Sequence, residues 1–174
     1  IKFIPNWADP NLIYPIKKDK KLTNENKLIF QYAGNIGRAQ GISYLIDAIK
    51  NINSSNFQFH FYGNGTYLDL ILKSKFENIF YKGIFTRKES NKYLNLCDVA
   101  IICLEKNMLG LGVPSKTYNI LCAAKPILYI GDINSEIAIL IKENNVGYIA
   151  EPGNIDSITD GIKWFINLNP TEMK

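Results

Sequence analysis

The sequence predicts an α/β fold built on a doubly wound parallel sheet, and three observations support this prediction. From residue 28 onward, short apolar segments alternate with segments whose apolar residues recur at helical spacing. The central apolar segments are hydrophobic along their whole length, which is typical of parallel strands covered by helices on both faces. A length of 174 residues with 47% hydrophobic residues is ordinary for one domain with a single core.

The first 27 residues precede this pattern. Pro5, Pro10 and Pro15 prevent a continuous helix and favour extended backbone over residues 1–16. Residues 17–27 are polar and basic and are expected to form a surface loop. The regular domain is therefore expected to begin at residue 28 and to extend to residue 174.

The alternating segments give the expected elements in order. Apolar segments are expected to form strands over residues 28–33, 57–62, 79–81, 98–104, 126–130 and 146–150. Amphipathic segments are expected to form helices over residues 41–52, 67–75, 87–96, 115–124 and 155–166. The first of these helices has a single apolar stripe, formed by Ile42, Leu45, Ile46 and Ile49.

Glycine and capping residues mark the ends of these elements. Gly34 ends the first strand, and the Gly-Asn-Gly run at 63–65 closes the second, because glycine permits the positive φ of a tight turn. Thr86 followed by Glu89 has the spacing of a capping box at the start of the third helix. Ser135 is interpreted either as an ordinary helix cap or as the start of a helix beneath a ligand.

Residues 110–131 are the first candidate for a binding site. A glycine-broken loop runs to Pro114, Ser115 occupies the N-cap position of a helix, and a short apolar strand follows. The apolar residues of that helix that fall at helical spacing on one face are Tyr118, Leu121 and Cys122. Such a loop presents backbone N–H groups and the positive end of a helix dipole, which suits a phosphate.

Arg38 and Lys116 are the expected phosphate ligands. The loop GNIGRAQG at 34–41 combines glycines, which let the backbone approach a ligand, with Arg38, whose planar guanidinium suits phosphate oxygens. Lys116 lies in the first turn of the expected helix, where a cation opposes the dipole unless an anion is bound nearby. For both residues, an exposed cation without a ligand is the alternative interpretation.

Composition excludes several other functions. The net charge of +4 comes from lysines spread along the chain, so no nucleic-acid partner is expected. Cys97, Cys103 and Cys122 show no paired spacing and are expected to be buried thiols in a reducing compartment, with no metal site.

His60 alternates with phenylalanines on a strand and is interpreted as structural. No apolar run approaches the length of a membrane span.

The phrase GVPSKTYNILCAAKPIL at 112–128 resembles the donor-binding segment of group 1 glycosyltransferases. The resemblance is greatest to the bacterial sugar transferases of surface polysaccharide assembly, whose pattern is roughly P-S-K-x-x-E-x-x-A-x-G-K-P. Asn119 stands at the usual Glu of this pattern, and Ala124 stands at the usual Gly. The phrases YAGNIGRAQG at 32–41 and IPNWAD at 4–9 extend the resemblance over nearly the whole chain.

This resemblance implies a Rossmann-like doubly wound sheet that forms the C-terminal half of a retaining GT-B glycosyltransferase. Residues 1–27 would be the interdomain linker, residues 28–174 would bind the nucleotide sugar, and the N-terminal acceptor domain would be absent from these residues. The implied reaction moves a hexosyl or N-acetylhexosaminyl group from a nucleoside diphosphate, with a UDP-sugar favoured, to a glycan or lipid-linked acceptor in bacterial cell-surface polysaccharide synthesis. The isolated chain is expected to bind a donor without turning it over.

The resemblance also assigns roles to residues. Arg38 and Lys116 would stabilise the leaving diphosphate without a metal or other cofactor. The donor-binding residues that it implies are Gly34, Asn35, Gly37, Gln40, Gly112, Val113, Pro114, Ser115, Thr117 and Asn119. Leu111 stands where the family has the Glu that contacts the sugar, and Leu111 cannot take that role. Glu105 is the candidate replacement, with an ordinary surface charge as the alternative.

The location and the competing function follow from the same resemblance. It implies a cytoplasmic protein, with or without peripheral contact at the inner face of the membrane. The alternative function is a stand-alone nucleotide-binding module without transferase activity. A second domain across the cleft would distinguish the two, because transfer needs an acceptor site.

Overall fold

The computed structural model describes residues 6–17, 27–52 and 56–168. They contain a six-stranded sheet with the order β3-β2-β1-β4-β5-β6. The strands are β1 (Leu28–Ala33), β2 (Phe57–Tyr62), β3 (Ile79–Tyr81), β4 (Val99–Cys103), β5 (Ile127–Ile130) and β6 (Gly147–Ala150). Every neighbouring pair is parallel, so the predicted parallel sheet is confirmed.

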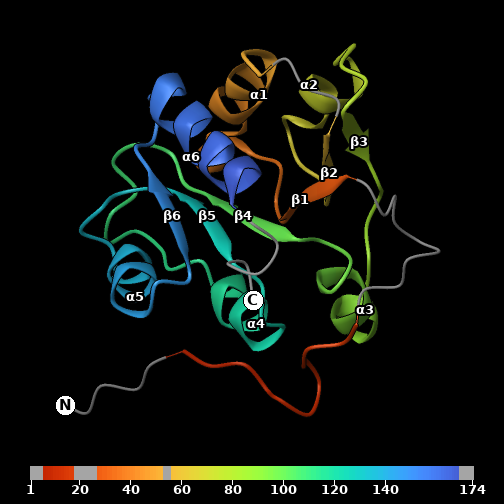
Figure 1. Ribbon diagram of the computed structural model, residues 1–174, viewed down its shortest axis with the longest axis vertical. Coiled ribbons are helices and arrows are strands. Elements are labelled where there is room, and N and C mark those ends of the chain that lie inside the picture. Colours follow the sequence, from red (N-terminus) through yellow and green to blue (C-terminus); the bar gives the residue numbers. More distant parts are fainter. Residues whose placement is uncertain (1–5, 18–26, 53–55, 169–174) are drawn as a thin grey trace.

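Helices cover both faces of the sheet (Figure 1). One face carries α1 (Ile42–Lys50), α2 (Leu68–Leu72) and α6 (Ile155–Asn167). The other face carries α3 (Ser90–Leu94), α4 (Lys116–Cys122) and α5 (Glu136–Asn144). Short 3₁₀ helices, η1 (Arg38–Gln40) and η2 (Arg87–Glu89), precede α1 and α3. This arrangement is the doubly wound fold that the alternating pattern predicted.

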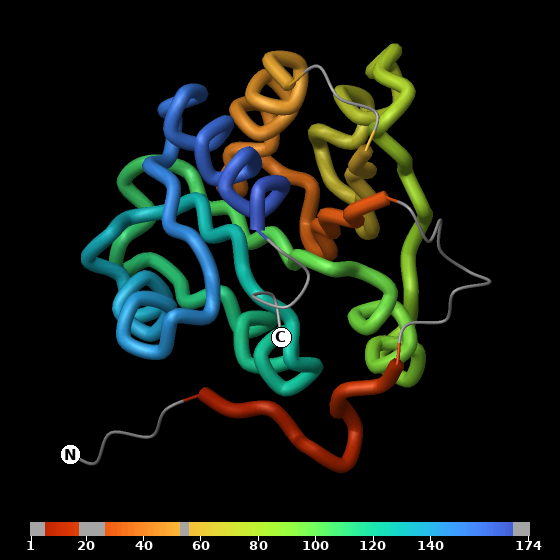
Figure 2. The backbone as a smooth tube through the Cα atoms, viewed as in Figure 1, coloured from red at the N-terminus to blue at the C-terminus, as the bar shows by residue number. Residues whose placement is uncertain are grey.

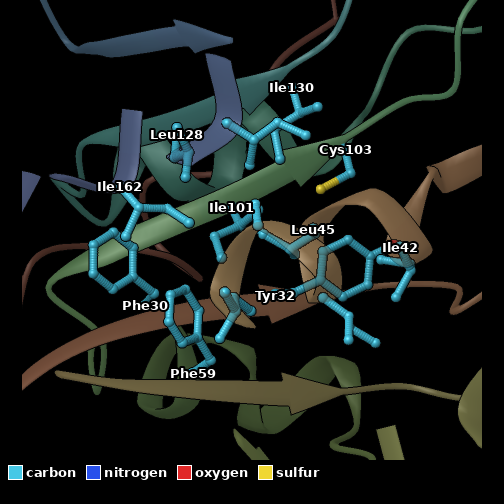
Figure 3. Packing of buried hydrophobic residues seen from close by; sticks show 14 of the residues in the cluster. Phe30, Tyr32, Ile42, Leu45, Phe59, Ile101, Cys103, Leu128, Ile130 and Ile162 are labelled. Carbon is cyan, nitrogen blue, oxygen red and sulfur yellow. The ribbon is translucent and has the colours of Figure 1, made fainter. Parts of the chain in front are cut away.

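The core under α1 and α6 is rich in aromatic rings (Figure 3). Phe30 of β1 stacks on Phe59 of β2 with ring centroids 5.0 Å apart. Phe165 of α6 meets Phe30 edge-on at 6.1 Å. Alternate residues of a strand point to opposite faces, so β2 directs its phenylalanines into this core and its polar residues to the other side.

His60 lies on that other side of β2 and is structural, as the sequence indicated. It is buried, its Nε2 lies 3.1 Å from Gln58 Oε1, and its ring meets Phe80 edge-on. Of the cysteines, Cys97 and Cys103 are buried and Cys122 is half-buried. Among the described residues, no group of three His, Cys, Asp or Glu side chains is placed to hold a metal ion. Nor does any helix of this part of the chain have the length and apolar character needed to cross a membrane.

Residues 6–17 run past α4 and α3 (Figure 2). Ile13 is buried in the second core, and its carbonyl oxygen accepts a hydrogen bond from Cys122 Sγ at 2.9 Å. The backbone N–H groups of Tyr14 and Ile16 donate to the side-chain oxygens of Asn91 and Asn95, each at 3.0 Å. The described part of the predicted linker is therefore bound to the domain. Linker residues 1–5 and 18–26, together with 53–55 and the expected domain end at 169–174, lie outside the described residues.

The observed helix ends differ from the predicted ends by a few residues, and the capping residues explain part of this difference. The expected helix over 87–96 begins as η2, where the backbone N–H of Thr86 donates to Glu89 Oε2 at 2.9 Å, as a capping box requires. Ser135 is the N-cap of α5, and its Oγ accepts a hydrogen bond from the backbone N–H of Ala138 at 3.2 Å. The interpretation of Ser135 as a helix cap is therefore confirmed.

Candidate functional site

The strand order reverses between β1 and β4, and a crevice opens there at the carboxyl ends of the strands. The chain leaves β1 toward β2 on one side and leaves β4 toward β5 on the other, so the two outgoing loops diverge. A cavity of about 320 Å³ lies at this point, and we call it the switch-point cavity. Its walls are residues 32–35 and Gln40 from the end of β1 and the segment after it, 101–104 from the end of β4, and Met108 and 112–116 from the later loop and the start of α4. The two loops that the sequence identified separately therefore face the same crevice.

Lys116 contributes a cation to this cavity. Its Nζ donates a hydrogen bond to the carbonyl oxygen of Ala33, the last residue of β1, at 2.8 Å. Although much of the side chain is exposed, burial around its ammonium lowers the pKa below the ordinary lysine value. An ammonium has three N–H donors, and the bond to Ala33 uses one of them. An anion in the cavity would compensate for the lost hydration of this charge.

The loop after β1 is braced on two sides. The Tyr32 hydroxyl donates to the carbonyl oxygen of Asn35, so the side chain of the strand holds the loop that follows it. Gly63 lies on the other side at φ 132°, and a Cβ there would overlap the carbonyl oxygen of Gly34. The side-chain amide nitrogen of Asn35, Nδ2, also donates to Gln40 Oε1 at 3.4 Å. Gly63 thus permits the close approach of two backbones, and Gly34 leaves room for the Tyr32 hydroxyl.

Arg38 has a different position from Lys116. It begins η1, between Asn35 and Gln40, which both line the switch-point cavity. Its own side chain is exposed and is not among the residues that line the cavity. Its expected role at the diphosphate therefore remains a prediction.

The start of α4 corrects one expectation. Ser115 already has helical backbone angles, φ −57° and ψ −23°, and its side chain makes no capping hydrogen bond. Ser115 is the N-cap residue of α4, as predicted, but an N-cap side chain reaches the first-turn N–H groups only from non-helical angles, so the expected capping hydrogen bond is absent. Thr117 makes the local side-chain contact instead, because its hydroxyl donates to the carbonyl oxygen of Pro114 at 2.7 Å.

The buried face of α4 also differs from the predicted one. The helix buries Thr117 and Ile120, whereas Tyr118, Leu121 and Cys122 are only half-buried. Both sets have helical spacing, and the hydrogen bond of Thr117 lets this polar residue take the inner position. The Tyr118 hydroxyl instead donates to Glu136 Oε1 at 2.7 Å, and partial burial together with that carboxylate raises the pKa of Tyr118 to about 12.

The structure brings together most of the expected donor-binding residues. Those that line the switch-point cavity are Gly34, Asn35, Gln40, Gly112, Val113, Pro114, Ser115 and Lys116. Those that do not line it are Gly37, Arg38, Thr117 and Asn119. Thr117 is fully buried beneath the loop, and Asn119 is half-buried further along α4.

Sequence reasoning did not identify Tyr32, and it left Glu105 undecided. Both lie near the carboxyl ends of β1 and β4, the strands beside the switch point, where ligands of such sheets bind. A position at or just past the end of an apolar segment is therefore a sequence signal for a binding residue. The backbone N–H of Glu105 donates to the carbonyl oxygen of Ala39 at 2.9 Å, which joins the loops after β4 and β1. Glu105 lines a second cavity that adjoins the first and shares residues with it.

Comparison with known proteins identifies the family. The model of the family described as glycosyl transferases group 1 matches residues 14–174. A probable glycosyltransferase, WbjE from Pseudomonas aeruginosa, is 36% identical over 161 residues, which are 87% of this chain and 40% of the relative. The chain therefore spans less than half of the curated relative that it matches.

Solved structures of low sequence identity share the fold. The C-terminal domain of a glycosyl transferase group 1 family protein, LpcC from Francisella tularensis, matches with a TM-score of 0.72 at 16% identity, over 95% of this chain and 90% of that one. TarM from S. aureus, in complex with fondaparinux, alpha-GlcNAc-glycerol and UDP, matches with a TM-score of 0.71 at 21% identity, over 96% of this chain and 32% of that one. These two likenesses concern the Rossmann-like fold of GT-B enzymes, and the family match extends over most of the sequence. The chain belongs to the glycosyl transferases group 1 family.

Proposed function

We propose that this chain is the nucleotide-sugar-binding, C-terminal half of a glycosyltransferase. The enzyme would move a hexosyl or N-acetylhexosaminyl group from a nucleoside diphosphate, with a UDP-sugar favoured, to a glycan or lipid-linked acceptor in bacterial cell-surface polysaccharide synthesis. One observation carries the proposal. The ammonium of Lys116 is fixed to Ala33 in the cavity at the reversal of strand order, where a sheet of this kind binds nucleotides.

The geometry suits departure of a diphosphate. When the bond between the anomeric carbon and the diphosphate oxygen breaks, negative charge develops on that oxygen. A cation already held in place stabilises this charge without reorganising during the reaction. Lys116 has this property because its bond to Ala33 orients the ammonium beforehand. Glycines at 34 and 112 leave the cavity wall open to a bulky phosphate. Such a departure needs no metal or other cofactor, and donor binding unchanged by EDTA is the expected result.

The comparisons support the proposal in two ways. The solved TarM complex contains UDP, and the LpcC domain that aligns over nearly its whole length is a C-terminal domain. The chain spans less than half of WbjE. We therefore place the acceptor site in a part of the protein beyond these residues, and we expect this chain alone to bind a donor without transferring its sugar. A cytoplasmic location, with or without peripheral contact at the inner face of the membrane, belongs to the same proposal.

Calorimetric titration of the purified chain tests the proposed ligand class. UDP should bind more tightly than UMP, and UMP more tightly than uridine, because each phosphate adds charge-assisted contacts. GDP is titrated in parallel to determine the base preference. Equal binding of UDP and uridine, or no binding of any nucleotide, would refute the proposal. A stand-alone nucleotide-binding module would also bind UDP, so sugar transfer by the full-length gene product separates that alternative from an enzyme.

A further inference from the structure

We propose that Tyr32 is a positioning residue for the diphosphate of the donor, because its hydroxyl holds the loop after β1 in a conformation that leaves the backbone N–H of Asn35 free beside the switch-point cavity. This inference rests on the proposed function, since the bound anion would be that of the nucleotide. Tyr32 lines the cavity and is only 5% exposed. Asn35 lines the same cavity and is exposed, so Tyr32 would act on a ligand through Asn35.

The Tyr32 hydroxyl holds one end of the peptide group that joins Asn35 to Ile36. It donates its proton to the carbonyl oxygen of Asn35. At the other end, the N–H of Ile36 donates to the carbonyl oxygen of Asn64, in the loop after β2, at 2.8 Å. A peptide group is planar, so hydrogen bonds at both ends fix its orientation. Ile36 is also fully buried, and its carbonyl oxygen accepts from the N–H of Tyr67 at 2.8 Å, which fixes the next peptide group as well.

The peptide group that joins Ala33 to Gly34 is held at both ends in the same way. Its carbonyl oxygen accepts from Lys116 Nζ at 2.8 Å, and its N–H donates to the carbonyl oxygen of Tyr62 at 2.9 Å. Between these two fixed groups lies the peptide group that carries the N–H of Asn35. Within the described part of the chain, this N–H donates to no carbonyl or side-chain oxygen. It is therefore a preorganised donor in the same cavity as the Lys116 ammonium, and such backbone N–H groups bind phosphate oxygens.

The ring and the hydroxyl of Tyr32 have separate contacts. The ring packs against Phe61 in the core, with ring centroids 6.1 Å apart. The hydroxyl reaches the loop because residue 34 is glycine, since a Cβ there would lie 2.9 Å from the hydroxyl oxygen. Burial raises the pKa of Tyr32, so the hydroxyl stays protonated at neutral pH and remains a donor. Removing the hydroxyl alone therefore tests the positioning role while the ring still fills the core.

Calorimetric titration of the Tyr32→Phe variant tests this role. The variant should bind UDP roughly three- to tenfold more weakly than the parent, because one neutral hydrogen bond no longer fixes the loop. Uridine binding should not change, since uridine has no phosphate for the Asn35 N–H to bind. Tyr148→Phe, which removes the hydroxyl of a half-buried tyrosine on β6, is the matched control and should bind both ligands as the parent does. Parental UDP binding by a folded Tyr32→Phe variant, or an equal loss for UDP and uridine, would overturn the inference.

Amide hydrogen exchange of the labelled parent chain gives a second test that needs no variant. The N–H of Ile36 should exchange slowly, whereas the N–H of Asn35 should exchange rapidly until UDP is added and should not respond to uridine. If UDP binds and the exchange of Asn35 does not change, this inference fails while the proposed function stands. If only GDP binds, GDP and guanosine replace UDP and uridine in both tests, with the same expectations. If neither nucleotide binds to the parent, the proposed function fails, and this inference fails with it. Urea denaturation verifies that each variant is folded.

Discussion

The ammonium of Lys116 donates a hydrogen bond to the carbonyl oxygen of Ala33 over 2.8 Å, although 83 positions separate the two residues in sequence. This bond joins the first turn of α4 to the end of β1, and thus to the loop that contains Arg38. It places a cation beside the point at which the strand order reverses.

Replacing Lys116 with Ala should weaken UDP binding. A charge-assisted contact to a phosphate contributes about 1.5–3 kcal/mol, which corresponds to roughly a 10- to 150-fold loss of affinity. Uridine binding should not change, because the base and the ribose do not contact the ammonium. Lys163→Ala, which removes an exposed lysine of α6, is the matched control and should behave as the parent. Calorimetry measures all of these affinities, and parental UDP binding by Lys116→Ala would mean that the cation is an ordinary surface charge.

Replacing Arg38 with Ala should have a smaller effect than replacing Lys116. Arg38 is exposed and does not line the switch-point cavity, so solvent screens its attraction for a diphosphate. We expect a loss of less than about tenfold, which decreases further at high salt. In the double variant the two losses should not add, because both cations would act on one anion. Additive losses would indicate that the two residues bind different groups.

Binding of UDP should weaken as the pH rises through the lowered pKa of Lys116. Burial lowers this pKa, so the ammonium loses its proton at a lower pH than an ordinary lysine does. Only the protonated form attracts the diphosphate, and affinity is therefore retained below this pKa and lost above it. The terminal phosphate of UDP, with a pKa of about 6, is already ionised above pH 8 and adds no slope there. Titrations from pH 8 upward should show the decline in the parent and none in Lys116→Ala, and a decline of equal size in both would point to another group.

The sheet was predictable because its signals are local. The boundaries of β1, β2 and β3 agree with prediction, since each apolar run ends at a glycine or a polar turn. The shared crevice was also predictable, because the carboxyl ends of parallel strands meet at one edge. The strand order itself comes from long-range pairing such as that of β1 with β4, which local sequence does not encode.

The errors concern residues whose role depends on tertiary contacts. Ser115 is the N-cap residue of α4, but its own backbone is already helical, so its side chain makes no capping hydrogen bond. The apolar face predicted for this helix contains Tyr118, Leu121 and Cys122, whereas Thr117 takes an inner position because its hydroxyl donates to the carbonyl oxygen of Pro114. Tyr32 was not identified because an aromatic residue on a strand looks like core, whereas its hydroxyl reaches past the strand to the Asn35 carbonyl.

Replacing Gly63 with Ala should destabilise the domain strongly. Gly63 has φ 132°, and a Cβ there would overlap the backbone carbonyl oxygen of Gly34, which cannot move without shifting the loop. We expect a loss of about 2–4 kcal/mol in the free energy of unfolding, from strain and steric overlap together. Gly153→Ala is the matched control, because Gly153 also has a positive φ, 78°, but a Cβ there would make only ordinary contacts.

Urea denaturation measures both variants. Gly153→Ala should lose only about 1 kcal/mol, which is the cost of a left-handed conformation for a residue with a side chain. Equal losses in the two variants would show that the close approach of residues 34 and 63 is not a source of stability.

Amide NMR spectra of the labelled chain, recorded with and without UDP, show directly which residues form the nucleotide site. We expect the largest shifts in residues 34–41, which follow β1, and in residues 112–119, which contain the loop before α4 and the first residues of that helix. A separate cavity at the amino ends of β5 and β6, lined by Lys125, Asn145 and Trp164, provides the contrasting location. Shifts gathered around those residues, with none in the two loops, would contradict the assignment of the nucleotide site.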